Sequence, residues 1–372
     1  MDQRFVDLAR VLVGHSTKVT KGDIVIVKST EAVPTDMIFA VIQAVREAGG
    51  SVIPWRYHPR IDFEALNGAN AHQLRAWGAG LFTQLAAANC FIEFRPFDNQ
   101  CDGSDVPDSD MDKFGEVFVP LTVEQRVERT RWVLTRWPTP ANAQLAGMST
   151  SEFEDFFFRA CLADYAAMAK SVKPLVALME ATDRVHIKGP GNTNLKFSIK
   201  GIPVIACTGT HNVPDGETFT APVRDSVNGV VHYNTITVNA RGQQFGNVRF
   251  GIDSGKIVKA SCQTGDQSAL DAFLDTDEGA RYFGEFALGI NPFVTKTIGE
   301  TLFDEKVGGS FHLTPGRCYE EAPNGNTSAN HWDIICDQRE EAGGGEILFD
   351  GKVIRRNGLF LPRNLKGLNP KN

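Results

Sequence analysis

Hydrophobic positions in the first 95 residues follow two alternating patterns. Short, largely apolar runs at 23–27, 51–55 and 90–94 predict strands, the first of them buried on both faces. Apolar residues recur with helical spacing over 34–48, and a second helix is predicted over 72–88. Alternation of strands and helices favours a parallel sheet with right-handed crossovers, so this part of the chain is predicted to be an α/β domain.

The pattern of hydrophobic positions is less regular between residues 95 and 183. The stretch 99–112 is polar and rich in aspartate, which predicts a loop, and a helix is predicted over 123–134. The segment 149–152 reads Ser-Thr-Ser-Glu, which is typical of a helix N-terminus. The long helix that it begins is expected to end before a break at 172–174, where a shorter helix follows.

Short apolar segments with glycine-bearing turns between them replace the helical pattern after Asp183. They lie at 185–187, 195–199, 230–238 and 248–250. Such spacing predicts a β-rich domain. We therefore predict an α/β N-terminal domain with a parallel sheet over 1–183, and an α+β, β-rich C-terminal domain that binds metal over 184–372.

Composition narrows the classes of function. The 372 residues provide ample material for a buried core, and the net charge of −7 argues against a nucleic-acid partner, because phosphate binding needs a basic field. No apolar run approaches the length of a membrane span, and no signal peptide is expected at the start. Seven cysteines without a Cys-x-x-Cys pair favour reduced thiols in a cytoplasmic protein.

Two motifs in the last third of the chain could hold a metal ion. In His331-Trp332-Asp333, an extended backbone would direct His331 and Asp333 to the same side, where imidazole and carboxylate can bind one ion together. A solvent-facing pair is the alternative. Glu285 lies in an apolar frame beside glycines, where a carboxylate must be paired, protonated or bound to metal. A salt bridge to Arg281 or Lys296 is the alternative there.

Four further residues extend this constellation. Glu217 follows a Pro-Asp-Gly turn and is expected to project from the first residue of a strand, although an ordinary exposed acid fits the same pattern. Glu305 precedes a glycine-containing loop that leads to His312, which could complete a set of ligands. Tyr319 could polarise a substrate oxygen near a cation.

The order of these motifs resembles that of the aminopeptidase T/aminopeptidase S family of metallopeptidases, also called the thermophilic metalloprotease family, over nearly the whole chain. The matching segments are 189–195, 212–222, 284–291, 302–306 and 326–333. The resemblance implies metal ligands at Glu217, Glu285, His312, His331 and Asp333, with Tyr319 at the site and Glu305 in a segment that reaches the metals. It also implies two nearby divalent ions and a homodimer that encloses the active sites.

The sequence therefore predicts a cytoplasmic, metal-dependent aminopeptidase that releases N-terminal residues from peptides. Two divalent ions are expected to activate the attacking water, and they are zinc, cobalt, manganese or magnesium. Glu305 is expected to shuttle a proton and Tyr319 to stabilise the oxyanion. The alternative is a ring-opening dioxygenase, or a metal-dependent hydrolase, that acts on a small aromatic compound with a single iron. A third possibility is a metal-dependent scaffold dimer without catalytic activity.

Overall fold

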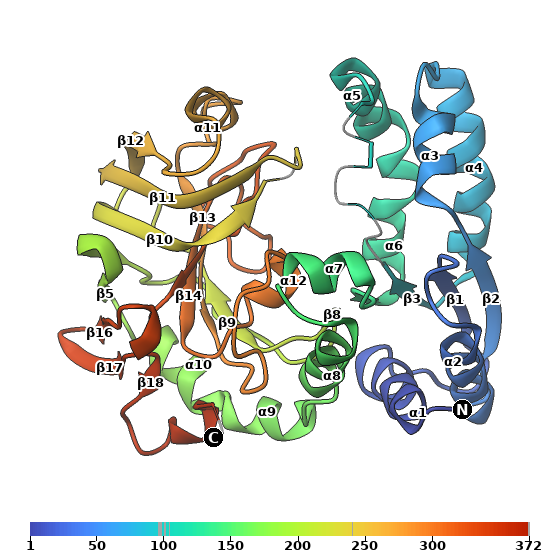
Figure 1. Cartoon of the computed structure of the whole chain (residues 1–372), viewed down its shortest axis with the longest axis horizontal. Coiled ribbons are helices and arrows are strands. Elements are labelled where there is room, and N and C mark those ends of the chain that lie inside the picture. Colours follow the sequence, from blue (N-terminus) through green and yellow to red (C-terminus); the bar gives the residue numbers. More distant parts are fainter. Residues whose placement is uncertain (96–98, 100–101, 104, 240, 371–372) are drawn as a thin grey trace. The chain divides into compact units, whose positions relative to one another are not determined.

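The computed structural model describes residues 1–95, 99, 102–103, 105–239 and 241–370. Its contacts divide the chain into two compact units (Figure 1). Unit 1 comprises Met1–Leu162 and Gly209–Pro214, and unit 2 comprises Ala163–Thr208 and Asp215–Asn372. The domain boundary near residue 183 stays a prediction. It is drawn from the change in sequence pattern, whereas the two units are defined by the contacts within them.

Unit 1 is built on a five-stranded parallel sheet, which confirms the predicted α/β class. The strand order is β2-β1-β3-β4-β8. The strands are β1 (Ile24–Ser29), β2 (Ser51–Arg56), β3 (Cys90–Phe94), β4 (Arg131–Thr135) and β8 (Asn212–Val213). The helices are α1 (Gln3–Arg10), α2 (Thr35–Glu47), α3 (Pro59–Leu66), α4 (Ala71–Ala87), α5 (Asp108–Val117), α6 (Val123–Arg129), α7 (Pro140–Leu145) and α8 (Thr150–Cys161). Helical turns of other types lie at Val11–Ser16 and Val119–Leu121.

Two local predictions in unit 1 are wrong in part. The helix predicted over 123–134 ends at Arg129, because the residues from Arg131 onward pair with β3 as a parallel strand. Sheet pairing therefore outweighs a helical sequence pattern. The loop predicted over 99–112 gives way to α5 from Asp108, and residues 100, 101 and 104 of that loop lie outside the described ranges. The predicted helix start is confirmed, since the Ser149 side chain accepts a hydrogen bond from the Glu152 amide at 3.3 Å.

Unit 2 contains two antiparallel sheets, in agreement with the predicted β-rich class. The larger has the order β12-β11-β10-β6-β5-β16-β17-β18 and the smaller β15-β14-β13-β9-β7. The larger is formed by β5 (Arg184–Gly189), β6 (Thr193–Ser198), β10 (Asn228–Val238), β11 (Gln244–Asp253), β12 (Lys256–Ser261), β16 (Glu346–Phe349), β17 (Lys352–Arg356) and β18 (Leu359–Phe360). The smaller is formed by β7 (Ile205–Cys207), β9 (Glu217–Thr220), β13 (Phe283–Gly289), β14 (Ser310–Pro315) and β15 (Ile335–Asp337).

Helices complete unit 2. They are α9 (Tyr165–Ser171), α10 (Lys173–Glu180), α11 (Gln267–Leu274) and α12 (Thr301–Asp304), with single turns at Pro190–Asn192, Glu340–Ala342 and Lys366–Leu368. The two sheets are joined by hydrogen bonds from Tyr233 Oη to the Leu313 carbonyl and from Thr235 Oγ1 to the Ile335 carbonyl, both 2.8 Å. Phe197 and Phe286 pack edge to face between them. Within the described ranges, no helix combines the length and apolarity that crossing a membrane requires.

Candidate metal centre

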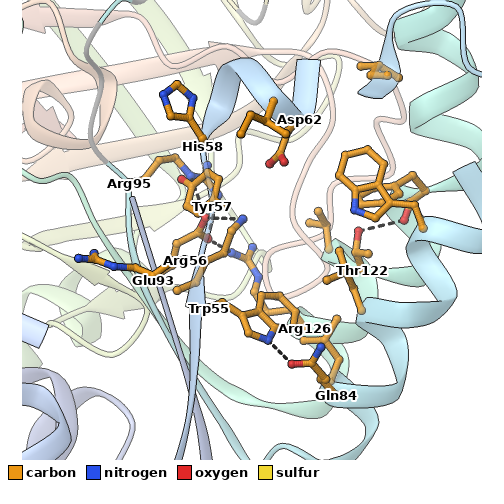
Figure 2. Close-up of a pocket in the computed structure, with 18 of the residues that line it drawn as sticks. Trp55, Arg56, Tyr57, His58, Asp62, Gln84, Glu93, Arg95, Thr122 and Arg126 are labelled. Carbon is orange, nitrogen blue, oxygen red and sulfur yellow. Dashed lines mark hydrogen bonds and ion pairs between the residues drawn. The ribbon is translucent and has the colours of Figure 1, made fainter. Parts of the chain in front are cut away.

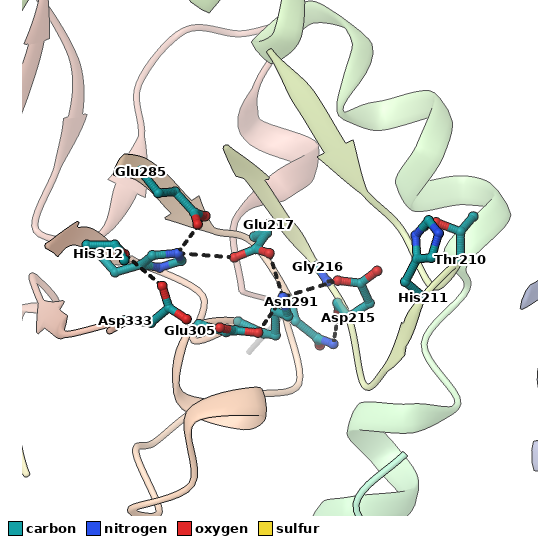
Figure 3. A network of polar contacts seen from close by, with 12 residues as sticks. Thr210, His211, Asp215, Gly216, Glu217, Glu285, Asn291, Glu305, His312 and Asp333 are labelled. Carbon is teal, nitrogen blue, oxygen red and sulfur yellow. Dashed lines mark hydrogen bonds and ion pairs between the residues drawn. The ribbon is translucent and has the colours of Figure 1, made fainter. Parts of the chain in front are cut away.

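Three of the predicted ligands lie on one face of the smaller sheet. β13 pairs with both β9 and β14, so that Gly289 lies opposite Glu217 and Ala287 lies opposite His312. Because alternate residues of a strand share a face, Glu285, Ala287 and Gly289 all face the same side. The side chains of Glu217, Glu285 and His312 consequently converge, as Figure 3 shows.

These three side chains are buried and in contact. His312 Nε2 lies 3.1 Å from Glu285 Oε1 and 3.4 Å from Glu217 Oε2. The salt bridge from Glu285 to Arg281 that the sequence left open is not what the structure shows. Arg281 pairs with Asp275 at 2.5 Å instead, and Glu285 faces the histidines.

His331 and Asp333 approach the same carboxylate from another segment. His331 forms an isolated bridge with Gly316, ahead of the start of β15. Its Nε2 lies 3.2 Å from Glu285 Oε2 and 3.3 Å from Asp333 Oδ1, while its Nδ1 is 2.9 Å from the Arg317 carbonyl oxygen. A hydrogen bond to that carbonyl fixes the tautomer, with Nδ1 protonated and Nε2 available as a ligand.

The residues around this pair hold it in place. Thr314 Oγ1 donates a hydrogen bond of 2.7 Å to Asp333 Oδ1. The intervening Trp332 is buried on the opposite side, where its Nε1 donates to Thr237 Oγ1 at 3.0 Å. The predicted arrangement, with His331 and Asp333 together and Trp332 in packing, is therefore what the structure shows, although the backbone here is not part of a regular strand.

Glu305 and the adjacent Lys306 follow α12 and contact the acids of the site. A Cβ atom on Gly289 would lie 2.3 Å from the Val307 carbonyl oxygen and 3.0 Å from that of Glu305, so glycine at that position allows this segment to approach closely. Lys306 is completely buried, and its Nζ lies 2.6 Å from Glu217 Oε1, 2.8 Å from Glu305 Oε1 and 3.5 Å from Asp215 Oδ1. One ammonium group thus joins three carboxylates.

Potential ligand atoms form two neighbouring triplets. One contains Glu217, Glu305 and His312, and the other contains Glu285, His331 and Asp333, with the atoms of each triplet within 4.8 Å of one another. The contact between Glu285 and His312 connects the two. Imidazole and carboxylate are the donors that zinc, cobalt and manganese take from proteins. A third triplet, of Cys207 and Asp215 with Glu217, adjoins the first.

Two buried atoms of the triplets make no hydrogen bond. Glu217 Oε2 and His331 Nε2 lack a hydrogen-bond partner among the residues that the structure describes, although each faces an ion-pair partner within 3.4 Å. Buried polar atoms are normally hydrogen-bonded, and each of these atoms belongs to a different triplet. The donor set and these two atoms fit a site for divalent cations.

Burial and neighbouring charges shift the pKa values of the acids and of His312 in different directions. Burial raises the pKa of Glu217 above its ordinary value. Burial also acts on Glu285 and Asp333, but the nearby imidazoles outweigh it and lower the pKa of both carboxyls. Against burial, the Glu285 and Glu217 carboxylates raise the pKa of His312 to about 9. The acids thus create a strongly negative environment that favours cations.

Tyr319 lies at the accessible end of the site. Tyr319 is 39% exposed, whereas the three glutamates of the site and His312 are buried. Its ring centroid lies 4.5 Å from that of His331 and 5.5 Å from that of Phe219. A molecule that approaches from solvent could therefore meet Tyr319 beside the second triplet.

The structure brings together all seven residues that the sequence singled out, and it adds others. Lys306, Asp215 and Thr314 stood in or beside the quoted motifs without being assigned to the site. A lysine next to two acids is normally a surface residue, so its sequence context held no sign of burial.

Comparison with known proteins gives a family match over most of the chain. The model of the thermophilic metalloprotease family (M29) matches residues 1–360. Aminopeptidase T of Thermus thermophilus is 30% identical over 227 residues, which cover 54% of this chain and 54% of that protein. Aminopeptidase T of Thermus aquaticus is 36% identical over 126 residues, or 32% of this chain and 30% of that protein. The matched regions thus span about half of these relatives or less.

Two solved structures share the fold. AmpT from Thermus thermophilus has a TM-score of 0.79 at 21% sequence identity, with 97% of this chain and 99% of that chain covered. A 2,5-dihydroxypyridine dioxygenase from Pseudomonas putida has a TM-score of 0.57 at 14% identity, with 98% and 97% covered. At these identities the likeness concerns the fold.

Proposed function

Because this chain belongs to the thermophilic metalloprotease (M29) family, we propose that it is a metal-dependent aminopeptidase that releases N-terminal residues from peptides. The observation that carries the proposal is the pair of adjacent histidine–carboxylate triplets, the first buried and the second partly buried, which are connected by the contact between Glu285 and His312. Aminopeptidase is also the printed name of the relatives reported above.

Five residues would hold the metals. Glu217 and His312 would hold one ion and His331 and Asp333 the other, with Glu285 shared between them, since its two oxygens face His312 and His331 separately. When bound, two divalent ions lower the pKa of water and polarise a carbonyl group. The identity of the ions is proposed as zinc, cobalt, manganese or magnesium.

Two other side chains would act on the substrate. Glu305 is a buried member of the first triplet, and its Oε1 lies 2.8 Å from Lys306 Nζ. Held in this way, Glu305 would accept the proton of the attacking water and pass it to the leaving amine. The partly exposed Tyr319 would donate its phenol proton in a hydrogen bond to the oxygen of the scissile carbonyl as negative charge develops there.

The substrate class, the cellular location and the oligomeric state of the enzyme are also proposals. The net charge of −7 supports a peptide or small-molecule substrate over nucleic acid. Cytoplasmic location is supported by cysteines without paired spacing, and the six cysteines that the structure describes are free. We propose a homodimer, as the family resemblance implies.

The test compares hydrolysis of leucine p-nitroanilide by the metal-loaded protein and its Glu217→Gln variant, with Glu278→Gln as a matched control because Glu278 is exposed. The two-ion scheme predicts that Glu217→Gln loses nearly all activity and that the control keeps it. Full activity in Glu217→Gln would contradict the two-ion scheme. Absence of any amide hydrolysis by the wild type, together with one iron per chain, would favour the aromatic-ring dioxygenase.

A further inference from the structure

Unit 1 contains a cavity of about 670 Å³ whose lining residues all belong to that unit (Figure 2). The lining comes mainly from β1, β2 and β3 and from helices α3, α4, α5 and α6. Volumes of roughly 300–1,000 Å³ are typical of pockets that bind small molecules. The proposed peptidase reaction uses none of these residues, so the cavity is available for a different ligand.

The cavity lies where the sheet topology favours ligands. From β1 the chain passes to β2 on one side and then to β3 on the other, so the order reverses between β1 and β3. In open parallel sheets, ligands bind outside the carboxyl ends of the strands at such a reversal. Lys28, near the end of β1, and Glu93, near the end of β3, are register partners, and both line the cavity.

Aromatic side chains form much of the wall. Trp55 and Phe91 pack edge to face with ring centroids 5.7 Å apart, and the ring centroids of Trp77 and Phe118 are 4.3 Å apart. The Trp55 indole donates a hydrogen bond to Gln84, which fixes the orientation of its ring (Figure 2). Aromatic rings attract one another in edge-to-face and offset-stacked contacts, so this wall suits a flat aromatic molecule.

The ionic side chains at one end of the cavity already have partners of opposite charge. The buried Glu93 carboxylate pairs with the cationic cluster of Lys28, Arg95 and Arg126, at 3.1, 2.9 and 2.9 Å. The Lys28 ammonium also acts on Asp62, because burial raises the pKa of that carboxyl and Lys28 opposes the rise. Burial of a charge costs free energy unless the charge finds a counter-charge. These pairs therefore favour an uncharged ligand over an ion.

A buried donor of Arg126, which lines the cavity, has no acceptor among the described residues. The donor is Nε, whereas Nη1 donates to the Glu93 carboxylate. The guanidinium lies 5.7 Å from the ring centroid of Phe91, so one small molecule can contact both. Buried N–H groups normally have an acceptor, and a carbonyl oxygen would supply one without bringing a charge.

We propose that this cavity binds an uncharged, flat aromatic molecule that carries a hydrogen-bond acceptor, such as an aryl ketone. Its carbonyl oxygen would accept a hydrogen bond from Arg126 Nε, and its rings would lie against Trp55 and Phe91. The proposal is independent of the peptidase reaction, because the lining belongs to unit 1 and the candidate metal ligands belong to unit 2.

The test compares three naphthalene derivatives of similar size by equilibrium dialysis against the full, metal-loaded chain. 2-Acetonaphthone carries a neutral carbonyl group, 2-ethylnaphthalene lacks an acceptor, and 2-naphthoate is an anion. We expect saturable binding of 2-acetonaphthone, about tenfold tighter than that of 2-ethylnaphthalene, because the ketone satisfies a buried, charged donor. 2-Naphthoate should bind more weakly than the ketone. Equal affinity for ketone and hydrocarbon, tighter binding of naphthoate, or absence of saturation would overturn the inference.

Arg126→Lys tests the donor directly. Lysine keeps a positive charge beside Glu93 but lacks the Nε–H group, so the advantage of the ketone should disappear while 2-ethylnaphthalene binds as it does to wild type. The matched control is Arg129→Lys, at an exposed position of the same helix outside the lining, and it should keep the advantage. An unchanged advantage of the ketone in Arg126→Lys would overturn the inference.

Two further comparisons locate the ligand. Leu81→Trp, which fills the cavity, should abolish binding of the ketone, whereas Val127→Trp, at an exposed position of α6, should not. Met111→Trp, at an exposed position of the lining, is the second filling variant in case Leu81→Trp does not fold. Removal of metal by a chelator should leave the affinity unchanged. Loss of binding after chelation, or full binding in folded filling variants, would overturn the inference, because the ketone would then lie elsewhere.

Discussion

Replacement of Lys306 by methionine removes an ammonium group that joins three acids of the candidate metal centre. Lys306 has no exposed surface, and its Nζ lies within 3.5 Å of Asp215, Glu217 and Glu305. Methionine keeps most of the side-chain volume, so the principal loss is the charge. Removal of one partner from a buried ion pair costs about 3–5 kcal/mol, because a buried charge is left uncompensated. We expect the free energy of unfolding of the metal-free variant to fall by that amount.

The assay is urea unfolding of chelator-treated and metal-loaded protein, with Lys200→Met as the control. Lys200 is exposed, so this substitution should stay within about 0.5 kcal/mol of wild type. Added divalent cations should recover part of the stability of Lys306→Met, because they bind the native acids and supply positive charge. A metal-free Lys306→Met protein as stable as the control would refute the reasoning that Lys306 neutralises buried, ionised carboxylates.

Three further predictions concern single residues. Glu93→Gln should lower stability by about 3 kcal/mol at pH 7, because three cations lose their buried partner. Those cations hold the pKa of Glu93 well below its ordinary value, although burial alone would raise it. The wild type should therefore lose this stability as the pH falls below about 4. In denaturant titrations at several pH values, the difference in stability between wild type and Glu93→Gln should shrink over that range. Thr314→Val removes the hydrogen bond to Asp333 and should weaken metal binding about 10–100-fold by calorimetry; unchanged affinity would contradict a positioning role. Tyr319→Phe should lower kcat about 100-fold or more with little change in metal content, and equal kcat would exclude the phenol from the reaction.

The residues of the candidate metal centre could be singled out from the sequence because they stand in short, distinctive segments. His331 and Asp333 are two residues apart, and Glu285 lies among apolar neighbours where an unpaired carboxylate is costly. Each signal was ambiguous alone, and the family resemblance placed them in one site. The structure explains their convergence by the registers of β9, β13 and β14, which no local pattern reveals.

Features that depend on distant contacts could not be predicted. Residues 131–134 are predicted as the end of a helix, yet they belong to a strand that pairs with β3. Lys306 is buried only because Glu217, 89 residues earlier, faces it. Likewise Glu93 and Arg126 are 33 residues apart, and the cationic cluster exists only once α6 packs near β3. In each case tertiary partners outweigh local preference.

The central claim is that two metal ions in this site enable release of N-terminal residues, and metal content measured with activity tests it most directly. The chain should be purified without chelator, its metals quantified, and its hydrolysis of aminoacyl p-nitroanilides followed before and after chelation. The account predicts about two divalent ions per chain, activity that disappears with chelation, and its return when zinc, cobalt, manganese or magnesium is added. One iron per chain without amide hydrolysis, or activity that persists after complete metal removal, would contradict it.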